Sequence, residues 1–509
     1  MAGQKNEGLT CVLYLIMALS NGERMSPRII LTSFLCILIV MPFRVNAFFW
    51  DHAWIKEIPP QERRMGAISH SIAIDAADQP HILYVARSKS GELSLRYTVR
   101  KGGSWFTDVV DPECGDSTVR IAISASGNLH TCYQGIDLIS QQTSLMYATH
   151  DTNQWSTHVV GNGGSGCSIA LNPEGLPFIS HIAENGELKL ARYDGTQWIT
   201  EDAATGANPV EPTSMAIAPS GEVHISFVSA TDPPIISWIR NGSGSWTSSF
   251  IDNGHQIGMV LDSSGAPRVV YNPDKGASVV YAYFNGRELI KFNILQHTWV
   301  PQTAYLSYHP AIAIDPKDAV HILYGLNHHF SGWTGELNYV KYDGVKWEPY
   351  NTVHTNYDGF RFVSSIAFDS FGIPCASYNI PRLHTIIRFA YFATPELSGT
   401  WSRFTVKNKK GLYSLKGKLK IINSGEGYAE TVQVNFFLSD DMNLSSDDVP
   451  LGQVNILRYV LDAGKRKTMK FSWKTPENLS GKYVLAVIDP DGLNIERNKT
   501  DNIVSQLIP

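Results

Sequence analysis

Histidine recurs at one position of a repeated segment, and imidazole is a side chain that can bind metal ions or carry protons. The second strand of four repeats holds it, at His81, His130, His224 and His321. Three other repeats have a different residue at this position, namely Phe178, Arg268 and Cys375. A zinc site needs its donors about 2.0–2.1 Å from one ion, whereas equivalent positions of successive repeats are spread around the molecule. Because Phe is tolerated there, we interpret these histidines as packing or hydrogen-bonding residues.

Carboxylates are a second source of chemistry. An Asp ends the first strand in four repeats, but Ser124, Asn172 and Ala218 take its place in others, which indicates a turn residue rather than a ring of ligands. Glycosidases need a pair of carboxylates across a cleft, and no motif singles out such a pair. The sequence also lacks the G-x-S-x-G, H-E-x-x-H and phosphate-loop motifs. We therefore assign no catalytic residue from the sequence.

An acidic loop near the C-terminus is the single candidate for a metal site. Its carboxylates are Asp440, Asp441, Asp447 and Asp448. Ca²⁺ takes 6–8 oxygen ligands, and this loop concentrates such donors, but their spacing differs from that of a helix-loop-helix calcium hand. A solvated loop without metal is the alternative, and no other cofactor is predicted.

Aromatic side chains in a long insertion of the sixth repeat are the candidate ligand site. The insertion contains Trp333 together with His328, His329 and Phe330. Flat aromatic rings provide apolar faces on which sugar rings can stack. We therefore predict that this loop contacts a saccharide, if the chain binds one.

The elements that position these residues form a repeat. A short apolar strand, Ser71–Asp75 in its first copy, returns about every 45–55 residues. Its copies centre on Ala122, Ala170, Ala216, Val260, Ala313 and Ala367. Each is followed by three more alternating strands, with Asp, Asn, Ser and Gly at the turns. Four antiparallel strands repeated seven times predict an all-β, seven-bladed β-propeller.

Closure of the ring needs a fourth strand for the last repeat. Two tryptophan-led segments could supply it, one starting at Trp54 and one at Trp401. We favour Trp54 to Ile58, because an N-terminal strand paired into the last blade leaves no open edge. Trp401 then begins the next domain.

The last hundred or so residues have a different pattern. Short alternating strands such as Lys416–Asn423, Thr431–Leu438 and Gly481–Val487 predict a small β-sandwich. An N-x-G turn, F-x-L-S-D, L-G, G-x-Y-x-L-x-A-x-x-D and E-x-N-x-x-x-N follow in order, and this segment resembles the CARDB module. That resemblance implies an immunoglobulin-like domain of bacterial cell surfaces. The repeats resemble, more loosely, bacterial extracellular propellers with S-I-A-x-D and P-H-I-x-Y motifs.

The N-terminal region indicates export. Arg28 precedes a largely apolar run from Ile29 to Pro42, which ends near Ala47, as in a secretory signal peptide. We expect translation to start at Met25. The expected organisation is therefore an extension and signal peptide over 1–47, a propeller over 48–396 and a sandwich over 397–509. The alternative is an uncleaved membrane anchor.

Charge and cysteine content limit the partners. The formal net charge is −5 and no basic cluster stands out along the sequence, so we expect no nucleic-acid partner. In an oxidising compartment cysteines can pair. Cys114 and Cys167 precede the first strands of adjacent repeats, so we predict that they could form a disulfide, whereas Cys132 lies within a strand as a buried thiol.

Three functions remain open at this point. The first is a secreted or cell-surface binding and adhesion scaffold whose propeller recognises a polysaccharide or a protein. The second is a propeller-type carbohydrate-active hydrolase or lyase. The third is a purely structural envelope protein. The absence of catalytic motifs favours the first and third over the second.

Overall fold

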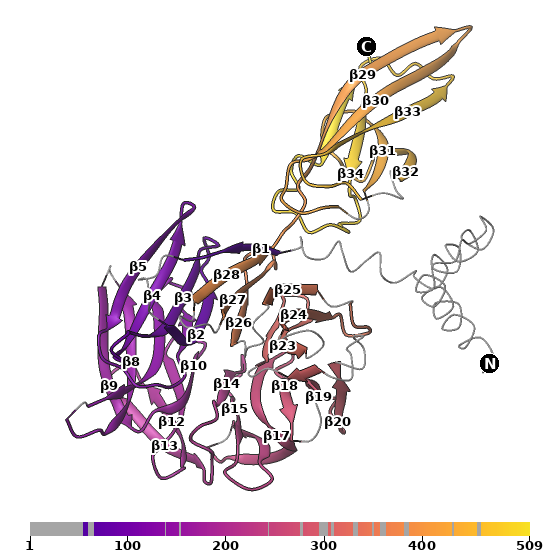
Figure 1. Ribbon diagram of the computed structural model, residues 1–509. Helices are drawn as coiled ribbons and strands as arrows, with labels where there is room; N and C mark the ends of the chain where they lie inside the picture. The colour runs from indigo at the N-terminus through magenta and orange to yellow at the C-terminus, as the bar shows by residue number, and fades with distance from the viewer. Residues whose placement is uncertain are drawn as a thin grey trace, which may run out of the picture. The chain divides into compact units, whose positions relative to one another are not determined.

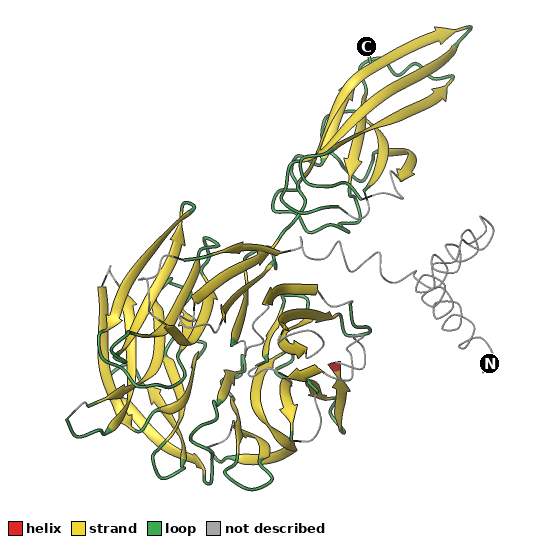
Figure 2. Ribbon diagram, in the orientation of Figure 1, coloured by secondary structure: helices red, strands yellow, loops and turns green. Residues whose placement is uncertain are grey.

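The computed structural model describes most of the chain from Trp54 onward. Described are residues 54–509, apart from 60–65, 138, 152–153, 243, 275–277, 295–303, 307–309, 329–333, 349–350, 357–362, 381–385, 430–431 and 456–459. Nearly all regular structure in this part is antiparallel β-strand (Figure 2). The predicted signal peptide and the Met25 start lie outside the described residues. No helix within the described residues has the length and apolarity needed to cross a bilayer.

Each of the first three repeats forms a separate four-stranded sheet (Figure 1). The first contains β2 (Gly66–Ile74), β3 (Pro80–Arg87), β4 (Leu93–Lys101) and β5 (Ser104–Asp111). The second contains β6 (Arg120–Ile123), β7 (Leu129–Ile136), β8 (Thr143–Asp151) and β9 (Gln154–Asn162). The third contains β10 (Ser165–Leu171), β11 (Pro177–Ile182), β12 (Leu188–Tyr193) and β13 (Trp198–Ala204). In each sheet the strands pair in chain order.

The fourth and fifth repeats share one sheet of seven strands, because a single long strand belongs to both. The strands are β14 (Ser214–Ile217), β15 (Val223–Val228), β16 (Ile235–Asn241), β17 (Thr247–Leu261), β18 (Pro267–Pro273), β19 (Val280–Phe284) and β20 (Leu289–Asn293). The first half of β17 pairs with β16 and the second half with β18. The chain therefore passes from one repeat to the next here without a loop.

The sixth and seventh repeats complete the series. The sixth contains β21 (Ala304–Leu306), β22 (Ala311–Ile314), β23 (Val320–His328), β24 (Thr334–Tyr342) and β25 (Asn351–Asn356). The seventh contains β26 (Ser364–Phe368), β27 (Pro374–Ile380), β28 (Ile386–Phe392) and, from the N-terminal end of the described chain, β1 (Trp54–Glu57). β1 pairs antiparallel with β28, with Trp54 opposite Phe392. The predicted closing strand is thus confirmed.

The first strands of the repeats form a closed ring. Each contacts the next, in the order β2, β6, β10, β14, β17, β22 and β26, and β26 contacts β2. These are the strands predicted from the repeated apolar segment. The fold is all-β and propeller-like, as predicted, and we interpret the ring as seven blades.

The turns between first and second strands explain why Asp recurs there. Asp75 Oδ1 accepts the backbone N–H groups of Ala77 and Gln79 at 2.9 and 2.8 Å. Asp262 makes the equivalent bonds to Ser264 and Ala266 in the fifth repeat. Gly265 in that turn has φ of +81°, a conformation that glycine adopts without strain. The Asp is a turn residue, as expected.

The C-terminal segment is a two-sheet sandwich. One sheet has the order β29 (Leu397–Lys409), β30 (Leu412–Asn423), β33 (Arg466–Thr475). The other has the order β32 (Val449–Asn455), β31 (Gln433–Ser439), β34 (Tyr483–Ile488), β35 (Ile503–Leu507). Leu419, Phe436 and Phe471 belong to the apolar core between them, and Trp401 packs against that core. Trp401 therefore belongs to the sandwich, as expected.

Candidate functional site

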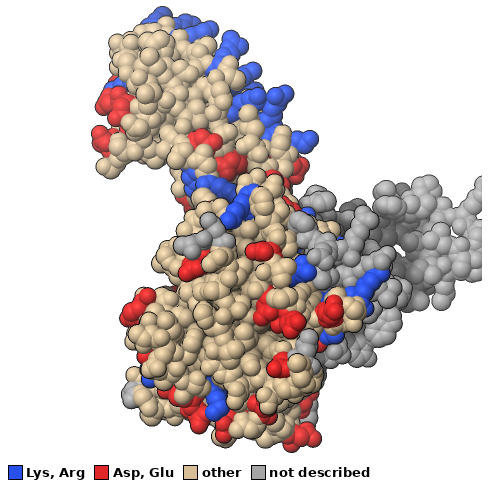
Figure 3. All heavy atoms as spheres, turned by 90° about the vertical axis from the view of Figure 1, so that its left-hand side faces the viewer, with Lys and Arg blue, Asp and Glu red and all other residues tan. Residues whose placement is uncertain are grey.

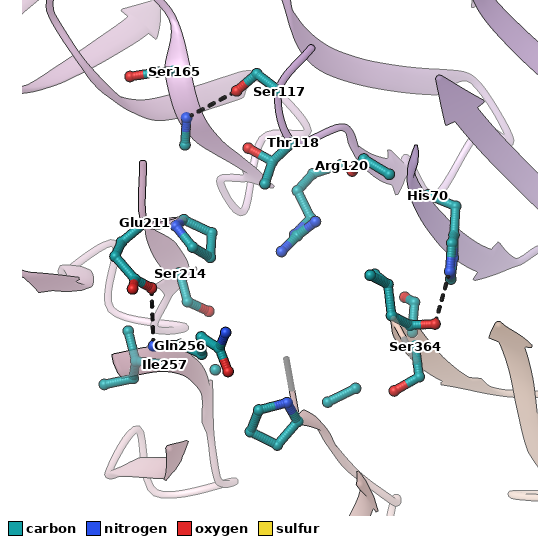
Figure 4. Close-up of a pocket in the computed structure, with 18 of the residues that line it drawn as sticks. His70, Ser117, Thr118, Arg120, Ser165, Glu211, Ser214, Gln256, Ile257 and Ser364 are labelled. Carbon is teal, nitrogen blue, oxygen red and sulfur yellow. Dashed lines mark hydrogen bonds between the residues drawn. The ribbon is translucent and has the colours of Figure 1, made fainter. Parts of the chain in front are cut away.

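A polar pocket lies where the repeats converge. Its volume is about 500 Å³, and every repeat supplies at least one lining residue (Figure 4). One representative from each repeat, in chain order, is His70, Arg120, Ser165, Glu211, Gln256, Ile312 and Ser364. Hydroxyl, amide and charged groups dominate, and none of the lining residues is Phe, Tyr or Trp. This composition suits a ligand rich in hydrogen-bonding groups.

The first strands are joined near the pocket by a recurring serine. Ser168 Oγ accepts the Met215 backbone N–H at 3.1 Å, and Ser214 Oγ accepts that of Met259 at 3.0 Å. Ser71 and Ser365 make the same type of bond at 3.4 and 3.3 Å. The serine at this position thus links the first strand of one repeat to that of the next.

Arg120 occupies the same position in the second repeat and breaks this pattern. The other repeats have only Ser71, Ser168, Ser214, Gly258, Ala311 or Ser365 there. Arg120 cannot provide the linking hydroxyl, and its guanidinium points into the pocket (Figure 4). A large cation replaces a small residue at one of seven equivalent positions. Gly258 and Ala311 also lack the linking hydroxyl, but Arg120 alone at this position brings a charged group to the pocket.

The Arg120 guanidinium has no carboxylate partner in the described part of the chain. Its Nη1 donates to the Val119 carbonyl at 3.0 Å, and burial lowers its pKa from the ordinary value. A guanidinium stays protonated at neutral pH even so, and it presents a planar fork of donors that matches carboxylate and sulfate groups. The pocket therefore offers an anion a partly desolvated cation.

The carboxylates of the pocket are already occupied by other protein groups. Asp116 pairs with Arg87 at 2.5 Å. Glu211 Oε2 accepts the Gln256 backbone N–H at 3.0 Å, and its Oε1 lies 3.0 Å from His255 Nδ1. Their negative charge is thus partly compensated, and Arg120 remains the charged group best placed to bind a ligand.

His70 is held by the scaffold rather than aimed at a ligand. Its Nε2 donates to the Val363 carbonyl at 3.0 Å, and its Nδ1 lies 2.9 Å from Ser377 Oγ. Both ring nitrogens are therefore engaged. An imidazole in this state is not available as a general base without breaking one of these bonds.

The repeated histidines have the structural role that their sequence pattern predicts. Nδ1 of His81, His130 and His321 lies 2.6, 2.7 and 2.6 Å from a tyrosine hydroxyl on the next strand. His224 Nδ1 instead accepts the indole N–H of Trp238 at 3.2 Å. All four are buried, and burial lowers the pKa of each. Among the described residues, no cluster of three or more His, Cys, Asp or Glu side chains could hold a metal ion.

The aromatic loop of the sixth repeat stays a prediction. His328 is the last residue of β23, and its backbone pairs with that of Thr334. His329, Phe330 and Trp333 lie outside the described residues. The pocket that the structure does show was missed because no catalytic or ligand-binding motif marks its residues. An alignment of the seven repeats would have found it, since Arg120 is the single charged residue at its position.

The acidic loop of the sandwich does not gather its carboxylates. Asp440 pairs with Lys482 Nζ at 2.6 Å, and Asp441 accepts the Asn443 backbone N–H at 2.7 Å. Asp447 accepts the hydroxyl and Asp448 the backbone N–H of Ser445, at 2.6 and 2.8 Å. Each of these carboxylates thus serves a local turn or ion pair, and the calcium site stays a prediction.

The predicted disulfide between Cys114 and Cys167 is not formed in this structure. Both are buried free thiols, as are Cys132 and Cys375. Cys114 packs with Leu95 and Tyr133, whereas Cys167 packs with Cys132 in the next apolar cluster along the ring. Burial raises the pKa of Cys114 to about 12, so its reactive thiolate form is scarce at neutral pH.

Comparison with known proteins identifies the family of one domain and finds similar solved structures. Residues 403–506 match the CARDB family. An ulvan lyase bound to -[GlcA(1-4)Rha3S]- aligns over 65% of this chain and 93% of its own, with 12% identity and a TM-score of 0.45. The propeller domain of the Trilobed protease from Pyrococcus furiosus aligns over 65% and 94%, with 9% identity and a TM-score of 0.41.

A sugar-binding protein is also among the similar structures. A variant of the Aleuria aurantia lectin in complex with Fucα1-6GlcNAc aligns over 53% of this chain and 93% of its own, with 12% identity and a TM-score of 0.36. No curated protein matches this chain by sequence. These similarities do not identify a ligand. Residues 403–506 form a CARDB domain, and an all-β, propeller-like domain precedes it.

Proposed function

We propose that the chain is a secreted or cell-surface binding scaffold whose propeller recognises an acidic polysaccharide. The observation that carries this proposal is Arg120, a cation without a carboxylate partner in a polar pocket lined by all the repeats. Sugars present many hydroxyl groups, which the serine, threonine and amide groups of the pocket complement. A carboxylate or sulfate on the sugar would pair with the guanidinium. The signal-like N-terminal segment supports export.

Binding is favoured over lyase or hydrolase activity by the state of the pocket's other groups. A lyase needs a base that can reach the substrate, and a glycosidase needs two carboxylates across its cleft. His70, Asp116 and Glu211 are each engaged with other protein groups. None of the described pocket residues is thus an unengaged base.

Arg120→Ser is the sharpest test, because serine is the commonest residue at this position and can restore the missing link between first strands. We expect this variant to fold and to melt no lower than the parent. It should bind a short acidic oligosaccharide, such as a trimer of galacturonate, at least about tenfold more weakly. Isothermal titration would measure this binding. Arg192→Ser, an exposed arginine of β12, is the matched control and should bind like the parent.

Mixtures of the protein with acidic oligosaccharides should also be assayed for released reducing ends and for unsaturated products. Retention of acidic saccharides without product would support the binding scaffold. Product that depends on Arg120 would overturn it in favour of a lyase or hydrolase. Equal binding by the parent and Arg120→Ser would remove the pocket from the proposal.

A further inference from the structure

Cations gather on one face of the sandwich, which corrects the expectation that no basic cluster exists. β29, β30 and β33 contain no Asp or Glu. Their outward-facing basic residues are Arg403, Lys407, Lys409, Lys416, Lys418, Lys420, Arg466, Lys470 and Lys474, hereafter the basic face. All are exposed except Lys420, which is half-buried. Figure 3 shows Lys and Arg side chains gathered along one side of the C-terminal domain.

Strand register, rather than sequence proximity, assembles this face. Arg403 lies opposite Lys418, and Lys418 lies opposite Lys470, so three cations form one row across the sheet. In the two outward rows that flank this one, Lys416 of β30 lies opposite Ser472 of β33, and Lys420 of β30 lies opposite Thr468 of β33. Residues on one face of a strand repeat about every 6.6–6.8 Å, and neighbouring strands are about 4.7–4.9 Å apart. The basic face is therefore a regular grid of positive charge with hydroxyl groups between.

This arrangement costs stability, which argues for a role outside the fold. Like charges directly opposite on neighbouring strands repel one another. No cation of the basic face has an ion-pair partner within the described part of the chain, whereas Lys482 of the same domain pairs with Asp440. Lysines on edge strands can serve to prevent aggregation, but Lys416, Lys418 and Lys420 lie on the central strand β30. The chain as a whole has a net charge of −5, so this local excess is not a consequence of composition.

We propose that the basic face is a second binding surface, which takes an extended polyanionic polysaccharide. Regular cations alternating with hydroxyl groups fit a polymer whose carboxylate or sulfate groups recur along its length. Binding would be driven by many exposed charges, so it should be multivalent and strongly dependent on salt. The surface is separate from the propeller pocket, and neither proposal depends on the other.

The outward residues distinguish a polysaccharide from the other polyanions. Sheets that bind single-stranded nucleic acids stack bases on exposed aromatic rings. Here Trp401, Phe404 and Trp473 pack against the sandwich core instead. The major groove admits a helix or a two-stranded ribbon, not the broad face of three strands. Membrane-surface elements combine cations with several apolar anchors. The outward positions of β30 hold two apolar residues, Leu412 and Ile422, near opposite ends of the strand, with Lys416, Lys418 and Lys420 between them.

Removal of the central row tests this proposal in the full chain. The variant Arg403→Gln, Lys418→Gln, Lys470→Gln removes three charges without touching the core. Its control removes three exposed lysines of the propeller, as Lys89→Gln, Lys317→Gln, Lys346→Gln. Long-chain polygalacturonate is the probe and neutral dextran the negative control, each measured by surface plasmon resonance over a series of salt concentrations.

We expect the central-row variant to lose about 100-fold in affinity for long polygalacturonate at low salt, and its control to bind like the parent. Affinity should rise with polymer length, whereas Arg120→Ser should retain this length-dependent binding. That difference separates failure of the basic face from failure of the pocket. Equal losses in both triple variants would overturn the proposal. Equal or tighter retention of duplex DNA or phosphatidylglycerol vesicles would also overturn it, in favour of that partner.

Discussion

The Tyr97 hydroxyl lies 2.6 Å from Nδ1 of His81 inside the first repeat. On the other side of the imidazole, His81 Nε2 lies 3.2 Å from Asp75 Oδ2. Because a carboxylate can only accept, Nε2 carries the proton and Nδ1 accepts from the tyrosine. The sixth repeat contains the same arrangement at Asp315, His321 and Tyr339. This Asp-His-Tyr chain therefore joins the turn, the second strand and the third strand of a repeat.

Tyr97→Phe should lower the free energy of unfolding by about 1–3 kcal/mol, because it leaves a buried ring nitrogen without a partner. Chemical denaturation followed by tryptophan fluorescence would measure the change. Tyr193→Phe is the control, since no described residue hydrogen-bonds the Tyr193 hydroxyl, and it should have little effect. A neutral result for Tyr97→Phe would show that water replaces the hydroxyl.

His181 should make the propeller sensitive to acid. It is 1% exposed, and neither ring nitrogen has a hydrogen-bond partner among the described residues. Burial lowers its pKa to about 4, below the unfolded value of 6.5, so the unfolded chain binds the proton more tightly. Stability is therefore full above the unfolded pKa and falls as the pH drops toward the folded one. The loss between pH 7.5 and 4 should be about 3 kcal/mol.

The variant His181→Leu should remove this part of the pH dependence and should raise the melting temperature most at low pH. Melting curves at half-unit steps of pH would show it. His158→Leu, at an exposed histidine of β9, should leave the slope unchanged. A His181→Leu slope equal to that of the parent would assign the acid sensitivity to other groups.

Glu496 should give the sandwich the opposite dependence. It is 4% exposed, accepts the Leu397 backbone N–H at 2.6 Å, and burial raises its pKa to about 7 from 4.5. The folded state then binds the proton more tightly, so this contribution is present at low pH and is lost as the pH rises from about 4.5 through 7. Glu496→Gln should flatten the stability of the sandwich over this range, as measured by hydrogen exchange of its strands. A persisting slope would place the titration elsewhere.

Trp54 should stabilise the closed ring. Its side chain is 4% exposed, and its ring centroid lies 5.3 Å from that of Tyr339 and 5.7 Å from that of Phe392. Trp54→Ala should cost about 3–5 kcal/mol and increase aggregation, because β28 would regain an open edge. Light scattering during thermal unfolding would report both effects. Phe106→Ala, at a side chain that is 56% exposed on β5, should change neither.

The sequence could predict the propeller because its signals are local. The repeated apolar strand, the Asp turns and the three alternating strands that follow all lie within a single repeat. Even the long-range pairing of β1 with β28 followed from one requirement, that the last blade must not keep an open edge. The structural role of the histidines could be predicted because equivalent positions of successive repeats are spread around the ring and cannot share one metal ion.

The two binding surfaces could not be found in the same way. Arg120 differs from its equivalents at one position only, so the signal appears when the repeats are compared with one another rather than in any motif. Arg403, Lys418 and Lys470 are far apart along the chain, and only the strand register brings them into one row. The cysteine pairing was misjudged for a related reason, since Cys167 lies within β10 and the side chains of Cys114 and Cys167 belong to different apolar clusters.

The long strand β17 has a mechanical consequence for the ring. Most joints between repeats contain turns that can bend, but Thr247–Leu261 runs through the fourth and fifth repeats as one strand with a single register shift in each half. The two repeats therefore share one strand, and moving them apart would require β17 to bend or to lose hydrogen bonds with β16 or β18. When the ring is stretched or opens locally, the fourth and fifth repeats should therefore move as one stiff segment. Transient opening of the ring should occur at the other joints between repeats.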